Sequence, residues 1–130
     1  MRQKAFAVAA RAPRALRCDE ILETGKHRFR FRPTPHLPHG WDAGVLFDET
    51  TGTLFCSDLF HQTDDVEPLT ESDVIGRTRA AMAAYRGGPL MDYMPYTPYA
   101  GRLLRELAAL NPRTLAIMHG SSFAGDCTRA

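Results

Sequence analysis

The chain has 130 residues, of which 44% are hydrophobic and 24% are charged, and its formal net charge at pH 7 is +1. This length and composition are typical of one globular domain with a single core. No apolar run approaches the roughly 20 residues that a membrane-spanning helix needs. Three cysteines without a C-x-x-C pair favour neither a disulfide framework nor a cysteine zinc site. The sequence therefore predicts a soluble, cytoplasmic protein that does not enter a membrane.

Charged residues are segregated along the chain. Residues 1–32 carry nine Lys or Arg and three acids, residues 33–76 carry nine acids and no Lys or Arg, and residues 77–130 carry seven basic residues and three acids. The acidic middle favours binding of cations over nucleic acid, although solvated acidic loops would give the same pattern. The basic start is interrupted by Pro13, which favours a connecting segment over residues 1–19 rather than a targeting sequence.

The first part of the chain predicts mainly strands. Residues 3–10 are rich in alanine and predict a short helix. Residues 20–32 predict two strands around a Gly-Lys turn, and alternation along the second strand places three side chains on the inward face: His27, Phe29 and Phe31. Residues 43–56 predict a hairpin with a glycine-containing loop. For His27, an edge or partly buried position is favoured over a role as a metal ligand.

Two helices and a last strand follow. A first helix is predicted over residues 70–86, with Asp73 three positions after its N-cap threonine. A second helix is predicted over residues 98–110, with a threonine N-cap and a proline at its first position. The Tyr- and Met-rich residues 89–99 between them either line a pocket or pack over helix ends, and packing is favoured. Residues 114–118 predict a buried strand. This order of elements is typical of the α/β class.

Histidine and carboxylate side chains stand at the ends of the predicted strands. His39 precedes the hairpin, Asp58 follows it, and His119 follows the last strand. Imidazole suits zinc and iron, and a carboxylate can bridge two ions, so these three residues form a chemically sensible metal site. Asp42, three residues after His39, is placed to orient that imidazole as a hydrogen-bond acceptor. His61, three residues after Asp58, is a weaker candidate.

Three segments resemble landmarks of the second half of a metallo-β-lactamase-fold domain, in the same order: PHGWDAGVLF, LFCSDLF and AIMHGSS. The chain is similar in particular to the β-lactamase-like module of flavodiiron proteins. The resemblance implies a partial αββα sandwich, with one sheet and flanking helices, in which residues 20–130 form the C-terminal half of the domain. It also implies that His39 and His119 are ligands of two different metal ions, that Asp58 bridges these ions, and that the cofactor is zinc or iron.

The family's N-terminal hallmark, H-x-H-x-D-H or H-x-E-x-D, has no counterpart in the chain. The resemblance therefore implies an incomplete site that holds metal weakly or not at all in this chain alone. Two functional classes stay open. The first is a hydrolase-like or di-iron-like protein that a complementary N-terminal chain completes, with a metal-activated water in the hydrolytic case. The second is a catalytically inactive remnant that acts as an oligomeric or binding protein. An uncovered sheet face predicts a homo-oligomer where no complementary chain is present.

Overall fold

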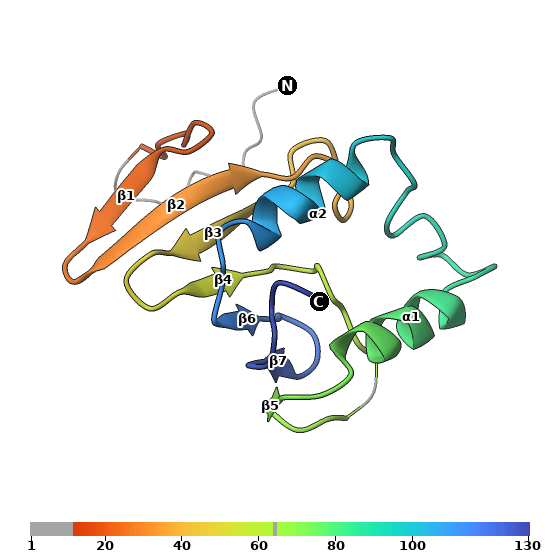
Figure 1. The fold of residues 1–130 in the computed structure, drawn as a ribbon. Coiled ribbons are helices and arrows are strands. Elements are labelled where there is room, and N and C mark those ends of the chain that lie inside the picture. The colour runs from red at the N-terminus through yellow and green to blue at the C-terminus, as the bar shows by residue number, and fades with distance from the viewer. Residues whose placement is uncertain (1–11, 64) are drawn as a thin grey trace.

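The computed structural model describes residues 12–63 and 65–130, so the helix predicted over residues 3–10 lies outside the described residues. Within them, a mixed sheet of seven strands has the order β1-β2-β3-β4-β6-β7-β5 and is accompanied by two helices (Figure 1). The strands are β1 (Ile21–Thr24), β2 (His27–Pro33), β3 (Gly44–Asp48), β4 (Thr53–Phe55), β5 (Leu69–Thr70), β6 (Thr114–Ala116) and β7 (Ser122–Phe123). The helices are α1 (Val74–Ala84) and α2 (Ala100–Ala108), and neither has the length and apolarity needed to cross a membrane.

The sheet consists of successive hairpins joined by a long crossover. Strands β1 to β4 pair antiparallel in chain order. The β3–β4 pair is the hairpin that the sequence predicts over residues 43–56. Strand β4 then pairs in parallel with β6, because the chain passes through β5 and both helices before it returns. Phe55 is aligned with Ala116 at the end of this ladder. Since parallel neighbours end at the same edge of a sheet, the segments that follow β4 and β6 leave the sheet together.

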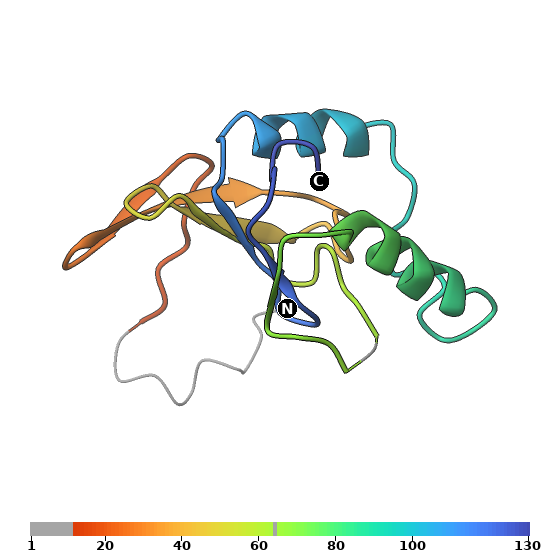
Figure 2. The ribbon, with the colours of Figure 1, turned by 60° about the horizontal axis from the view of Figure 1, so that its bottom comes forward.

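One face of the sheet carries the hydrophobic core beneath α2. The strand register places Val45, Phe47, Leu54 and Leu115 on this face, and all four side chains are buried. Leu103 and Leu107 of α2 lie four residues apart, on one side of the helix, and belong to the same buried cluster. Figure 2 shows α2 lying along this side of the sheet. The core is therefore a layer between α2 and the sheet.

The opposite face of the sheet is also apolar, and it stays partly exposed in the described part of the chain. The register aligns five of its side chains across four strands: Phe29, Phe31, Leu46, Phe55 and Ala116. None of these five residues is buried, and Phe55 is 44% exposed. We call this set the open face. The inward position that alternation predicts for His27, Phe29 and Phe31 is therefore wrong: Phe29 and Phe31 lie on the open face, and His27 is exposed. The sequence left undecided which alternate set of the β3–β4 hairpin would face α2, and the register shows that it is the set with Val45, Phe47 and Leu54.

Both helices begin later than the sequence predicts. Thr70 lies in β5 and is aligned with Phe123 of β7, so it does not cap a helix. Asp73 is the N-cap of α1 instead, and its carboxylate accepts a hydrogen bond from the backbone N–H of Gly76 at 3.0 Å. The N-cap predicted for the second helix is likewise wrong, because α2 follows Tyr99 and has no side-chain cap.

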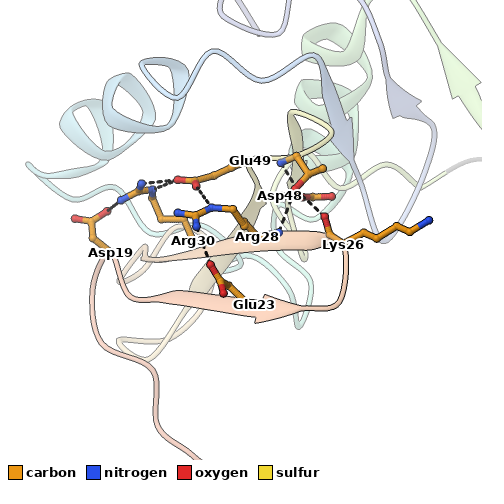
Figure 3. Close-up of polar contacts among 8 residues, drawn as sticks. Asp19, Glu23, Lys26, Arg28, Arg30, Asp48 and Glu49 are labelled. Carbon is orange, nitrogen blue, oxygen red and sulfur yellow. Dashed lines mark hydrogen bonds and ion pairs between the residues drawn. The ribbon is translucent and has the colours of Figure 1, made fainter.

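Ion pairs connect the β1–β2 hairpin to the turn between β3 and β4 (Figure 3). Arg28 contacts Glu23 at 2.7 Å and Glu49 at 3.4 Å. The Nε of Arg30 donates a hydrogen bond to Glu49 at 2.7 Å. These side chains are partly exposed, so solvent screening keeps the contribution of each pair small.

A buried carboxylate closes the same end of the sheet. Asp48 accepts hydrogen bonds from the Thr51 hydroxyl at 2.8 Å and from the Thr50 backbone N–H at 3.0 Å, and it lies 2.7 Å from Nδ1 of His27. Burial of Asp48 opposes its ionisation, but the hydrogen bonds from Thr51, His27 and Thr50 outweigh burial and lower its pKa to about 2. His27 is thus a structural partner of Asp48 at the rim of the open face.

Asp48 is expected to make the protein sensitive to acid. Its folded pKa of about 2 lies below its ordinary value of 3.8, so its contribution to stability is present above pH 4 and is lost as the pH falls towards 2. The Asp48→Asn variant should melt at a lower temperature than the unchanged protein at pH 7, and the difference should shrink towards pH 2. Melting curves followed by circular dichroism between pH 2 and pH 7 measure this. Glu23→Gln, which removes an exposed acid of the same hairpin, is the control, and an equal effect in both variants would contradict the prediction.

Candidate metal centre

Three loops at one edge of the sheet supply the predicted ligands. His39 lies between β2 and β3, Asp58 follows β4, and His119 follows β6. The loop of His39 is rich in proline, and His39 has a φ of 65°. The backbone N–H of His39 donates a hydrogen bond to the Tyr93 carbonyl at 3.0 Å, which fastens this loop to the segment between the helices.

Backbone hydrogen bonds beyond the strand ends hold Asp58 and His119 near each other. The N–H of Cys56 donates to the Ala116 carbonyl at 2.9 Å, and the N–H of Met118 donates to the Ser57 carbonyl at 3.2 Å. Cys56 is fully buried. The parallel pairing of β4 and β6 therefore continues up to the residues that precede the two candidate ligands.

The carboxylate of Asp58 lies between two imidazoles. Its Oδ2 is 3.0 Å from Nε2 of His39, and its Oδ1 is 3.2 Å from Nε2 of His119. Asp58 is mostly buried, with 24% of its side chain exposed, whereas the two histidine side chains are about half exposed. The predicted convergence of the three residues is confirmed, although 80 positions separate His39 from His119. Their role as metal ligands stays a prediction.

A further histidine joins this group, one that the sequence marks only as a weaker candidate. Ligand atoms of Asp58, His61 and His119 all lie within 4.8 Å of one another, and the rings of His61 and His119 are 4.9 Å apart between centroids. Burial of His61 lowers its pKa, and the nearby His119 lowers it further, which favours the neutral imidazole that binds metal ions. The signal in the sequence is the spacing D-x-x-H, which a tight turn closes through a 3.2 Å hydrogen bond from the His61 N–H to the Asp58 carbonyl.

Gln62 fixes the distance between the loops that follow β4 and β6. Its backbone N–H donates to the His119 carbonyl at 2.7 Å. Its buried side-chain amide donates to the Ser121 carbonyl and accepts from the Ser121 N–H, both at 3.2 Å. Arg77 of α1 also donates to the Ser121 hydroxyl at 2.9 Å. Gly120, between His119 and Ser121, has a φ of 125°. These contacts hold His61 and His119 at a defined separation.

Two tyrosines surround the histidines. Tyr93 is buried, donates a hydrogen bond to the Asp58 carbonyl, and packs edge-on against His39 at 4.8 Å and His61 at 5.4 Å between ring centroids. Burial raises the pKa of the Tyr93 hydroxyl well above its ordinary value, so the phenol stays protonated. The hydroxyl of Tyr85 lies 2.6 Å from Nε2 of His61. The aromatic segment between the helices therefore packs directly against the candidate centre.

Asp42 lines a cavity of about 140 Å³ together with His39 and Asp58. Within the described residues no hydrogen bond joins Asp42 to His39, whose ring contacts Asp58 and Tyr93 instead. The orienting role of Asp42 therefore stays a prediction. Around Asp58, the donor set of imidazole nitrogens and one carboxylate is suited to zinc or iron, so the residues fit the cofactor that the resemblance implies.

The fold is similar to that of several solved structures, although the sequence matches no protein-family model and no curated protein. A mutant of the flavo di-iron protein from Thermotoga maritima has a TM-score of 0.70 and 25% identity over 89% of this chain and 29% of that chain. A metallo-beta-lactamase family protein from Thermus thermophilus has a TM-score of 0.52 and 25% identity over 92% of this chain and 33% of that chain. The chemotaxis sensor ODP from T. denticola has a TM-score of 0.64 and 17% identity over 85% of this chain and 44% of that chain.

The chain spans less than half the length of each of these three proteins. The matches cover between 85% and 92% of this chain. The comparisons thus confirm the fold predicted from the sequence, a partial metallo-β-lactamase-like α/β fold similar to the β-lactamase-like module of flavodiiron proteins.

Proposed function

We propose that this protein binds zinc or iron at the sheet edge around Asp58, as a metallo-β-lactamase-like protein with hydrolytic or di-iron chemistry. The observation that carries the proposal is the position of the Asp58 carboxylate, which has a histidine Nε2 at 3.0 Å on one oxygen and another at 3.2 Å on the other. A bound zinc ion would supply Lewis-acid activation of water, and a bound iron would supply redox chemistry.

The protein's own residues prepare this centre in two ways. Tyr93 holds the backbone of Asp58 and packs against His39, so the carboxylate and one imidazole are fixed from the same side. His39 and His119 keep about half of their side-chain surface exposed, which leaves the centre accessible to an ion and to a small substrate. Fixed donors with open access are the features that a metal site needs for chemistry rather than for structure alone.

A second chain is part of the proposal for the dinuclear case. The H-x-[HE]-x-D motif is absent from these 130 residues, so further ligands for a second ion would come from outside them, in this proposal from a complementary N-terminal half. A catalytically inactive oligomeric or binding protein is the second candidate function. The open face favours it, since an exposed apolar sheet face is suited to association with another chain.

Metal titration of the Asp58→Asn variant tests the proposed function. The amide keeps the shape of the side chain and removes its charge. The affinity for Zn²⁺, or for Fe²⁺ in the absence of oxygen, should therefore fall by more than about 100-fold. Loss of a residue that only supports a metal ligand costs less, about 10- to 100-fold. Calorimetric titration of the chelator-treated protein measures the affinity, and metal analysis after desalting gives the stoichiometry. Asp126→Asn, an exposed acid near the C-terminus, is the control. Equal binding by Asp58→Asn, or no binding by the unchanged protein, would contradict the proposal.

A further inference from the structure

We infer that a single ion is held by Asp58, His61 and His119, and that His39 positions the carboxylate without binding this ion. The inference rests on the proposed metal binding. In the ligand set that the resemblance implies, it replaces His39 by His61. It gives this chain a mononuclear site with two imidazoles and one carboxylate, a combination that leaves coordination positions open. Such a site needs no ligand from a second chain.

Distances among the donor atoms favour His61 over His39 as the third ligand. Within the described residues, Asp58, His61 and His119 are the group whose ligand atoms all lie within 4.8 Å of one another, and His39 is outside that group. Donors that share one zinc ion at about 2.0–2.2 Å lie about 3–4 Å apart. Movements of about 1 Å would therefore close the three donors around an ion.

The two oxygens of Asp58 face different partners. Oδ1 is 3.2 Å from Nε2 of His119, and Oδ2 is 3.0 Å from Nε2 of His39. An ion on the Oδ1 side meets His119 and His61. The Nε2–H of His39 can then donate to Oδ2 and fix the direction of the carboxylate, as residues that support metal ligands commonly do. In this arrangement Oδ1 of Asp58 binds the ion, and Oδ2 accepts the supporting hydrogen bond from His39.

Tyr85 gives His61 the support that a metal-binding imidazole requires. Its hydroxyl is 2.6 Å from Nε2 of His61, which leaves Nδ1 as the nitrogen available to an ion. The rings of Tyr85 and Tyr93 pack edge-on against His61 at 5.6 Å and 5.4 Å between centroids, so they restrict rotation of the imidazole. A histidine held in this way can bind an ion without a large loss of side-chain entropy.

Cobalt titration of three variants tests the assignment. Co²⁺ added to the metal-free 130-residue protein reports its ligands through its visible absorption spectrum. His61→Ala should weaken Co²⁺ binding by more than about 100-fold and alter the spectrum, because a ligand is lost, whereas loss of a supporting hydrogen bond costs about 10- to 100-fold. His39→Ala should weaken Co²⁺ binding by only about 10- to 100-fold and should leave the spectrum unchanged. His39→Gln keeps an N–H donor for Oδ2 and should restore most of the affinity. Circular dichroism confirms that each variant is folded.

The alternative outcomes separate this inference from the proposed function. Loss of Co²⁺ binding and of the spectrum in His39→Gln, with both retained in His61→Ala, would make His39 the ligand and overturn the inference while metal binding at Asp58 stands. A changed spectrum in both His39→Gln and His61→Ala would also overturn it, since His39 would then touch the ion. Failure of the unchanged protein to bind Co²⁺ would overturn the inference. Full binding of Co²⁺ by Asp58→Asn would overturn both the inference and the proposed function.

Discussion

Gly120→Ala is expected to destabilise the folded protein by about 2–5 kcal/mol and to prevent metal binding. Gly120 has a φ of 125°, a region that residues with a side chain rarely adopt. A Cβ at this position would also lie 2.6 Å from Cβ and 2.7 Å from Cδ of Gln62. Because Gln62 is buried and bonded to Ser121 through both of its amide atoms, its displacement breaks the link between the His61 and His119 loops.

Gly87→Ala is the matched control for this variant. Gly87 also has a positive φ, of 77°, but apart from its two neighbours in the chain no residue has a heavy atom within 4 Å of the position that a Cβ would occupy. This variant should lose about 1 kcal/mol through backbone strain and should bind metal as the unchanged protein does. Urea unfolding followed by circular dichroism measures the free energy of unfolding, and Co²⁺ titration measures binding. Equal losses in the two variants would show that backbone strain, rather than contact with Gln62, determines the effect.

Two copies of the chain are expected to associate through the open face. The exposed parts of its apolar side chains lie together on one surface, around Phe55. Burial of apolar surface contributes about 25 cal/mol per Å², so several hundred Å² would contribute on the order of 10 kcal/mol, as much as the net stability of a domain. A two-fold dimer that pairs this face with its own copy covers it in both chains at once.

Phe55→Lys is expected to prevent the predicted dimer from forming. A lysine at the centre of the open face would place a charge in the interface without a partner, which is costly when it is buried. Light scattering during gel filtration should give twice the chain mass of 14.5 kDa for the unchanged protein and a single chain mass for the variant. Leu90→Lys changes a residue with the same 44% exposure in the segment between the helices and should remain dimeric. An unchanged protein that stays monomeric at high concentration would contradict the prediction.

The sequence predicts where the strands of this fold lie better than it predicts which side chains of each strand face α2. Residues 43–56 predict the β3–β4 hairpin because a glycine-containing loop separates two apolar segments. Which alternate set faces α2 depends on strand register, and register is fixed by partners that are distant in sequence. The predicted start of α1 is wrong for a similar reason. Thr70 has the side chain of a good N-cap residue, but its strand pairs with β7 instead.

The residues of the candidate centre likewise differ in how well the sequence predicts their positions. His39, Asp58 and His119 stand at strand ends, so the order of elements predicts that they converge. His61 lies in an acidic loop without periodicity, and the direction of its ring depends on Tyr85, which is 24 positions away in the chain. No local pattern in the sequence encodes that contact. The distances that favour His61 over His39 therefore appear only in three dimensions.

The parallel ladder between β4 and β6 also determines when the centre can assemble. Leu54 is aligned with Leu115, so this pairing closes a loop of about 60 residues, and contacts across such distances form late in folding. During synthesis on the ribosome, His39, Asp58 and His61 emerge well before His119. An ion that meets the nascent chain finds only part of the donor set. Metal binding at the proposed centre would thus follow folding, because the complete donor set exists only once β4 and β6 have paired.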